Sequence, residues 1–141
     1  MENSFDLQML HEEERFKRAK FAQCNLHELK MVSTCAHDGE GEIGFCRIAD
    51  EKTLDGTCHF IDYAIMPPHT AIGEHLHRVD EEEFYLVIEG HGIMRINGKE
   101  FSVRAGDLIR NPPSGSHALR NPGPGELKLF VFEVTVNPKQ L

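Results

Sequence analysis

The stretch that decides the fold of this chain runs from residue 83 to residue 103 and reads EFYLVIEGHGIMRINGKEFSV. Near its end, Asn97-Gly98 separates two short runs rich in apolar residues, 93–96 and 99–103. An Asn-Gly pair favours the positive φ angles of a type I′ turn, which joins two antiparallel strands. The stretch therefore predicts a β-hairpin, preceded by a further strand over residues 83–89.

Similar runs extend outward from this hairpin over most of the chain. From about residue 42 onward, short apolar segments alternate with Gly, Pro and Asn, which is typical of an antiparallel sandwich or barrel. The other predicted strands are 42–47, 59–66, 73–77, 108–111, 117–120 and 127–136. The expected fold class is all-β, with about eight or nine strands.

The first 35 residues have a different character. Residues 4–22 favour a helix, because Glu13 with Lys17 and Glu14 with Arg18 are oppositely charged pairs four residues apart. We therefore expect a short N-terminal helical extension over residues 1–35 and a single β-barrel domain over residues 36–141.

The length and charge of the chain narrow the function classes. Its 141 residues suit one domain. Fifteen Lys and Arg against 23 Asp and Glu give a net charge of −8, which argues against binding to nucleic acid. The N-terminus lacks the pattern of a secretory signal, and no apolar stretch is long enough to cross a membrane. We expect a cytoplasmic protein without membrane association.

Three histidines and an acidic run are the candidate functional residues. His75 and His77 stand two residues apart in a predicted strand, so they share a face, and His117 follows a proline-containing turn. The acidic run covers residues 80–83. Three imidazoles and a carboxylate suit a divalent transition metal such as Zn, Fe, Mn or Ni. A hydrogen-bonded polar cluster without a metal is the alternative interpretation.

These residues resemble the two sequence motifs of the cupin superfamily. The first motif contains H-x-H followed by E-x6-G, which His75, His77, Glu83 and Gly90 match. The second motif is matched by Gly106, Pro112, His117 and Asn121 at the family's spacings, with Ser114 in place of one glycine. The resemblance implies a double-stranded β-helix (jelly-roll) barrel, a mononuclear metal site held by His75, His77, Glu83 and His117, and a homodimer.

The position of the carboxylate ligand stays open between two residues. Five residues separate His77 from Glu83, where the motif has three or four. Glu82 matches the motif's distance from His77, whereas Glu83 matches its distance to Gly90. We favour Glu83, because a strand fixes the face of its side chains while the loop before it can absorb one extra residue.

Substrate contacts are predicted from strand alternation and charge. Tyr85 shares a face with Glu83 and offers a hydroxyl for catalysis, although a tyrosine in a strand also serves packing. Arg47 and Arg110 lie in predicted strands and suit an anionic substrate group, with an exposed barrel rim as the alternative role.

The resemblance favours a metal-dependent enzyme acting on a small oxygen-rich substrate such as a sugar or a carboxylate. The reactions it implies are isomerase- or epimerase-like, or dioxygenase-like, because the family's metal motif serves all of them. The alternative is a noncatalytic cupin module that binds a small ligand. We do not expect a regulator with a helix-turn-helix domain, because about 35 residues are too few to fold as that domain.

Overall fold

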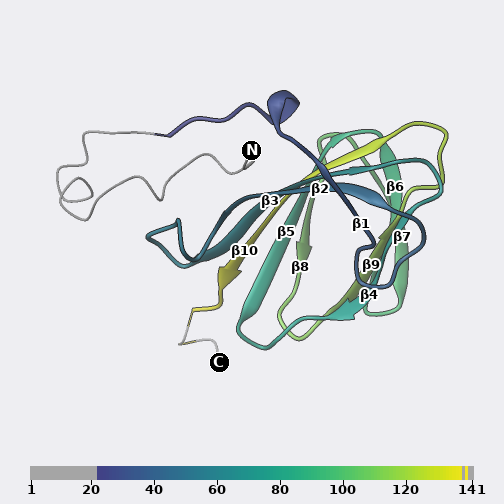
Figure 1. The fold of residues 1–141 in the computed structure, drawn as a ribbon. Coiled ribbons are helices and arrows are strands. Elements are labelled where there is room, and N and C mark those ends of the chain that lie inside the picture. Colours follow the sequence, from purple (N-terminus) through teal and green to yellow (C-terminus); the bar gives the residue numbers. More distant parts are fainter. Residues whose placement is uncertain (1–21, 138, 140–141) are drawn as a thin grey trace.

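The computed structural model describes residues 22–137 and residue 139. Within these residues, ten strands form two antiparallel sheets that face each other (Figure 1). The six-stranded sheet has the order β1-β2-β3-β10-β5-β8, and the four-stranded sheet has the order β4-β9-β6-β7. The strands are β1 Val32–Thr34, β2 Ile43–Asp50, β3 Cys58–Met66, β4 Ala71–Leu76, β5 Glu81–Glu89, β6 His91–Ile96, β7 Lys99–Arg104, β8 Leu108–Asn111, β9 Ser116–Arg120 and β10 Leu127–Thr135.

The all-β class and the central hairpin are confirmed. Ile96 at the end of β6 pairs with Lys99 at the start of β7. Asn97 and Gly98 between them have φ angles of 49° and 83°, as a type I′ turn requires. Each predicted strand coincides with an observed one to within a few residues.

Only the last part of the expected N-terminal extension lies within the described residues. Most of the expected helix, residues 4–21, lies outside the described residues. The part that follows contains a 3-10 turn, Leu26–Glu28, and then β1, which pairs with β2 at the edge of the six-stranded sheet. Strand β1 was not predicted, because three residues are too short for an alternation to show.

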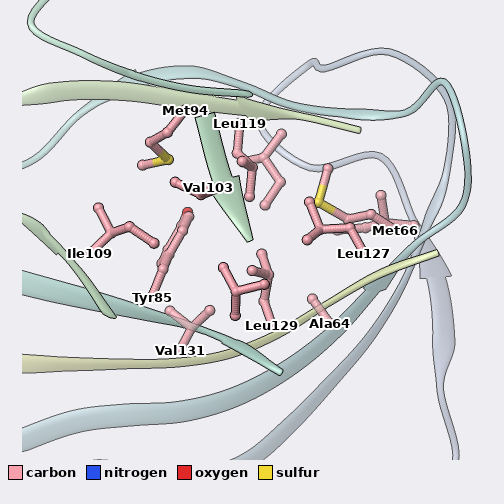
Figure 2. Close-up of a cluster of buried hydrophobic side chains, with 13 residues drawn as sticks. Ala64, Met66, Tyr85, Met94, Val103, Ile109, Leu119, Leu127, Leu129 and Val131 are labelled. Carbon is pink, nitrogen blue, oxygen red and sulfur yellow. The ribbon is translucent and has the colours of Figure 1, made fainter. Parts of the chain in front are cut away.

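The apolar core fills one end of the space between the two sheets (Figure 2). Met66, Met94, Leu127 and Leu129 are fully buried there. Along β10, the buried side chains are Leu127, Leu129, Val131 and Glu133, so this inner row ends in a carboxylate. The barrel interior is therefore apolar at one end and polar at the other.

A second apolar layer covers the part of the outer face of the six-stranded sheet that β2 and β3 form. Cys46, Ile48 and Tyr63 are buried there under the segment that precedes β1, which contributes Leu26 and Leu29. The described part of this segment therefore packs on the outside of the barrel. Within the part of the chain that the structure describes, no helix has the length and apolarity needed to cross a membrane.

Candidate metal centre

The polar end of the barrel interior brings together side chains from three strands. His75 lies in β4 and His77 directly after it, while His117 lies opposite His75 in β9. In a regular strand, the side chains of Ile72 and His75 would point to opposite faces, because the residues are three positions apart. A register irregularity between them lets both side chains face the interior. Glu83 enters from β5 in the other sheet.

These four residues converge on one point. One ligand atom from each of His75, His77, Glu83 and His117 lies within 4.8 Å of every other. The Oε1 atom of Glu83 is 3.1 Å from Nε2 of His117 and 3.6 Å from Nε2 of His77. The sequence left the carboxylate open between two residues, and the structure places Glu83 in the cluster, with Glu82 outside it.

The donor atoms could hold a metal ion. Nδ1 of His75 is 2.8 Å from the Gly73 carbonyl, so Nδ1 carries the proton and Nε2 keeps its lone pair. Within the described residues, neither ring nitrogen of His77 nor Oε1 of Glu83 has an aligned hydrogen-bond partner, although all three atoms are buried. Buried polar atoms are costly to leave unsatisfied, and a shared cation would satisfy Nε2 of His77 and Oε1 of Glu83. The four residues therefore fit a divalent transition metal.

The protonation states suit the same role. Burial lowers the pKa of His75 to about 4 and that of His117 to about 3, so both imidazoles are neutral at pH 7. Neutral imidazole is the form that binds metals. Burial raises the pKa of Glu83 to about 7, so its charged form is poorly stabilised in the absence of a cation. The neighbouring carboxylate of Glu133 raises the pKa of His77.

A cavity of about 430 Å³ opens beside the cluster. Arg47 lies at the rim of this cavity, with a side chain that is 46% exposed. Its guanidinium stacks on the ring of Phe60, 4.5 Å from the ring centroid. Asp62 holds this guanidinium through two contacts, Nε to Oδ1 at 3.0 Å and Nη2 to Oδ2 at 3.1 Å. The cavity thus combines a metal-type cluster, an aromatic wall and one oriented cation.

Tyr85 lines the same cavity. Its hydroxyl is 3.3 Å from Nε2 of His117, and the side chain is almost completely buried. Burial and the nearby Glu83 carboxylate raise its pKa well above the usual value, so the hydroxyl stays protonated. The position is the one that alternation along β5 predicted.

The structure does not bring Arg110 to the cavity. Its neighbours Ile109 and Asn111 in β8 are buried, so alternation turns Arg110 to the outer face of the sheet. There its Nε atom pairs with Oε2 of Glu82. Membership in a strand could not say which face the side chain would take, and the expected substrate contact by Arg110 is corrected on this ground.

Comparison with known proteins identifies the family. The family model of the Cupin domain matches residues 62–133, half of the chain. The chain belongs to the cupin superfamily. This cupin is similar to the oxalate-binding protein of Thermotoga maritima, with 27% identity over 93 residues that cover 66% of this chain and 76% of the relative.

Solved structures support the same fold. A predicted oxalate decarboxylase from Thermotoga maritima matches with a TM-score of 0.76 and 22% identity, covering 81% of this cupin and 99% of that chain. A sugar phosphate isomerase of the cupin superfamily from Silicibacter pomeroyi matches with a TM-score of 0.64 and 17% identity, covering 82% of this cupin and 76% of that chain. At these identities the likeness shows the fold alone.

Several residues of this cupin's site were not predicted. His37 stacks on His75 with ring centroids 3.5 Å apart, and Asn111 is buried beside Glu83 in the adjacent strand. The position of His37 gave no sequence signal, because it lies in a loop. Glu133 did give one, since it continues the alternation of Leu127, Leu129 and Val131, and a charged residue in a buried row points to a site.

Proposed function

We propose that this cupin binds one divalent transition-metal ion through His75, His77, Glu83 and His117 and acts as a metal-dependent enzyme on a small carboxylate- or sugar-type substrate. One observation carries the proposal: donor atoms of four residues converge within 4.8 Å next to a cavity of small-molecule size, and two of them, Nε2 of His77 and Oε1 of Glu83, are buried without an aligned hydrogen bond. A bound ion would supply Lewis acidity toward an oxygen atom of the substrate.

Arg47 supports an anionic substrate. A guanidinium binds a carboxylate or phosphate through two parallel hydrogen bonds, and this one is already oriented by Asp62 at the rim of the cavity. An anionic group held there would direct the rest of a small molecule toward the cluster, which lines the same cavity. We assign Arg47 to substrate binding on this basis.

Tyr85 supports a role in proton transfer. Its hydroxyl faces the cluster and keeps its proton, so it can donate a hydrogen bond to an oxygen atom that gains negative charge. We propose Tyr85 as the catalytic hydroxyl. Its replacement by Phe would leave the packing of the ring unchanged and remove this donor.

The relatives narrow the substrate class. One is named for binding oxalate and another is titled a sugar phosphate isomerase, so both names point to small anions rich in oxygen. The cation of Arg47 fits either kind of anion. We propose small carboxylates first, because the relative named for oxalate aligns over 76% of its own length.

The alternative is a noncatalytic cupin that binds a small ligand. The name of the Thermotoga maritima relative favours it, since that name records binding rather than turnover. Arg47 and the metal-type cluster would serve binding equally well. Turnover in a screen of small carboxylates, sugars and sugar phosphates separates the two functions, and saturable binding without product would favour the module.

Metal analysis tests the proposal directly. Purified protein is offered Fe, Mn, Ni and Zn in turn, and the ion content per chain is measured for the wild type and for His77→Ala. We expect about one ion per chain in the wild type and a large loss in the variant. Wild-type protein that retains less than about a tenth of an ion per chain would contradict the metal site.

A further inference from the structure

A second carboxylate and a second imidazole stand behind His77. Oε1 of Glu133 lies 3.1 Å from Nδ1 of His77, within hydrogen-bond distance, although the two groups are not aligned as a hydrogen bond in this structure. Oε2 of the same carboxylate lies 2.9 Å from Nδ1 of His59, whose Nε2 is 2.6 Å from the hydroxyl of Thr135. These contacts form a continuous path from the cluster to the end of β10.

A β-bulge brings His59 into this path. Glu133 pairs with Phe60 and Val134 pairs with Cys58, so His59 is the extra residue of β3 opposite β10. In an unbroken strand, His59 would point away from the face that carries Phe60 and Asp62. The bulge redirects its side chain, and the ring reaches a carboxylate of the inner row.

Glu133 is well placed to hold His77. Its side chain is 7% exposed, and it lies next to Glu83 in the register of β10 and β5. If an ion takes Nε2 of His77, which faces Glu83, Nδ1 is left to donate its proton to a carboxylate behind the ring. A carboxylate in this place fixes the tautomer and the orientation of a metal-binding imidazole.

Glu81 is the competing acceptor, and the geometry disfavours it. Its Oε2 atom is 3.4 Å from Nδ1 of His77, and its side chain is 24% exposed. The same oxygen already accepts a hydrogen bond from the backbone N–H of Arg78. Glu133 is nearer, more deeply buried and held from behind by His59.

We propose that Glu133 and His59 are positioning residues of the metal centre. Glu133 accepts a hydrogen bond from Nδ1–H of His77, so that Nε2 of His77 presents its lone pair to the ion. His59 binds the other oxygen of the Glu133 carboxylate and fixes its orientation. This inference rests on the proposed function, because it assigns His77 to the metal. It adds two residues from strands that contribute no ligand.

Cobalt(II) titration followed by calorimetry tests the inference. Glu133→Gln should weaken Co²⁺ binding by about 10- to 100-fold, because the two imidazoles face different carboxylate oxygens and one of these is replaced by an NH₂ group, which cannot accept. His59→Leu should weaken binding by about tenfold, whereas His59→Asn should stay within about twofold of the wild type, since its amide N–H replaces the Nδ1 proton. Glu81→Gln is the matched control and should also stay within about twofold.

A double variant shows whether the two residues act in series. If His59 acts through Glu133, the combined Glu133→Gln and His59→Leu variant should bind Co²⁺ no more weakly than Glu133→Gln alone. Fully additive losses would overturn the serial arrangement. Wild-type affinity in both single variants, or an equal loss in Glu81→Gln, would overturn the assignment of Glu133.

The tautomer of His77 in the metal-free protein provides a readout independent of metal binding. Long-range proton–nitrogen NMR at about pH 8 should show the Nδ1–H form in the wild type and in His59→Asn, and a shift toward Nε2–H in Glu133→Gln. Wild-type protein that fails to bind Co²⁺ would refute the proposed function. An Nε2–H form in the wild type would refute the positioning role by itself.

Discussion

Glu82 and Glu83 are chemically identical neighbours that occupy different environments. Glu83 faces the barrel interior, where burial raises its pKa to about 7, and its carboxylate lies among the imidazoles. Glu82 faces outward and pairs with Arg110. The alternation of a strand alone separates a candidate ligand from a surface ion pair.

This pair provides a matched test of the ligand set. Glu83→Gln should weaken Zn²⁺ binding by more than about tenfold, because it removes the anionic donor from a buried site. Glu82→Gln should change the affinity by less than about twofold, since exposed ion pairs contribute little. The dissociation constants are measured by competition with a metal chelator. Comparable losses in both variants would contradict the assignment of Glu83.

Backbone contacts hold the loop that carries His37 against strand β4. The segment that carries His37 packs on β4, where the N–H of Gly73 donates to the carbonyl of Ala36 over 3.0 Å. A side chain at Gly73 would place its Cβ 2.0 Å from the carbonyl oxygen of His37. Only glycine permits this approach, and it keeps the ring of His37 stacked on His75.

Gly73→Ala should therefore destabilise the protein by about 1–3 kcal/mol, because the backbone of β4 or of the loop must shift. Thermal unfolding of the metal-free protein measures the loss. Gly56→Ala is the control, since a Cβ there meets nothing within 4 Å, and we expect a change of less than about 0.5 kcal/mol. A Gly73→Ala variant as stable as the wild type would show that the contact is easily relieved.

The response of the whole molecule to acid follows from the buried titratable groups. Burial lowers the pKa of His75 and His117 from 6.5 to about 4 and about 3, and raises the pKa of Glu83 from 4.5 to about 7. Below pH 6.5 the unfolded chain binds protons at His75 and His117, whereas these two histidines stay neutral in the folded protein. The folded protein binds one proton at Glu83, so the unfolded chain still binds more protons in total. The pKa of His77 is raised in the folded protein, so His77 stabilises the fold, and this stabilisation is fully present below the pKa of His77 in the unfolded chain. It therefore does not change further as the pH falls from about 6 to about 4.

We therefore expect the free energy of unfolding of the metal-free protein to fall as the pH decreases from about 6 to about 4. Urea denaturation in the presence of a chelator measures it at several pH values. His117→Asn removes one of the resisting imidazoles and should show a shallower decrease. Stability that rises toward acid would contradict the burial effects on the two histidines.

The outer face of the six-stranded sheet bears on assembly. Ile88 in β5 and Leu108 in β8 are 39% and 61% exposed, and they continue an apolar face that includes the stacked rings of Phe84 and Phe132. A second copy would cover this face, which agrees with the homodimer that the family resemblance implies. We propose this face as the interface of the homodimer.

Light scattering should give a mass of twice the 16.0 kDa of one chain. The double variant Ile88→Glu with Leu108→Glu should shift the protein to monomers, because two charges would have to be buried at the interface. Leu76→Glu, at a 74% exposed position in the other sheet, is the control and should leave the mass unchanged. A monomeric wild type would refute the homodimer.

The sequence by itself determined the strand pattern, the central hairpin and the family. These features depend on local chemistry: alternation of apolar residues, the turn preference of Asn97-Gly98, and motif spacings that keep His75, His77 and His117 recognisable. Strand parity also placed Tyr85 on the face of Glu83, where the structure has it. Local rules sufficed because each strand fixes its own side-chain directions.

Only the tertiary structure decided which strands meet and where the alternation breaks. Arg110 lies in a predicted strand but faces away from the cavity, whereas Glu133 completes a buried row beside Glu83. His59 reaches Glu133 through a bulge that violates the period of two on which sequence interpretation depends. Contacts between residues far apart in the chain depend on sheet order and register, and those emerge only when the two sheets pack together.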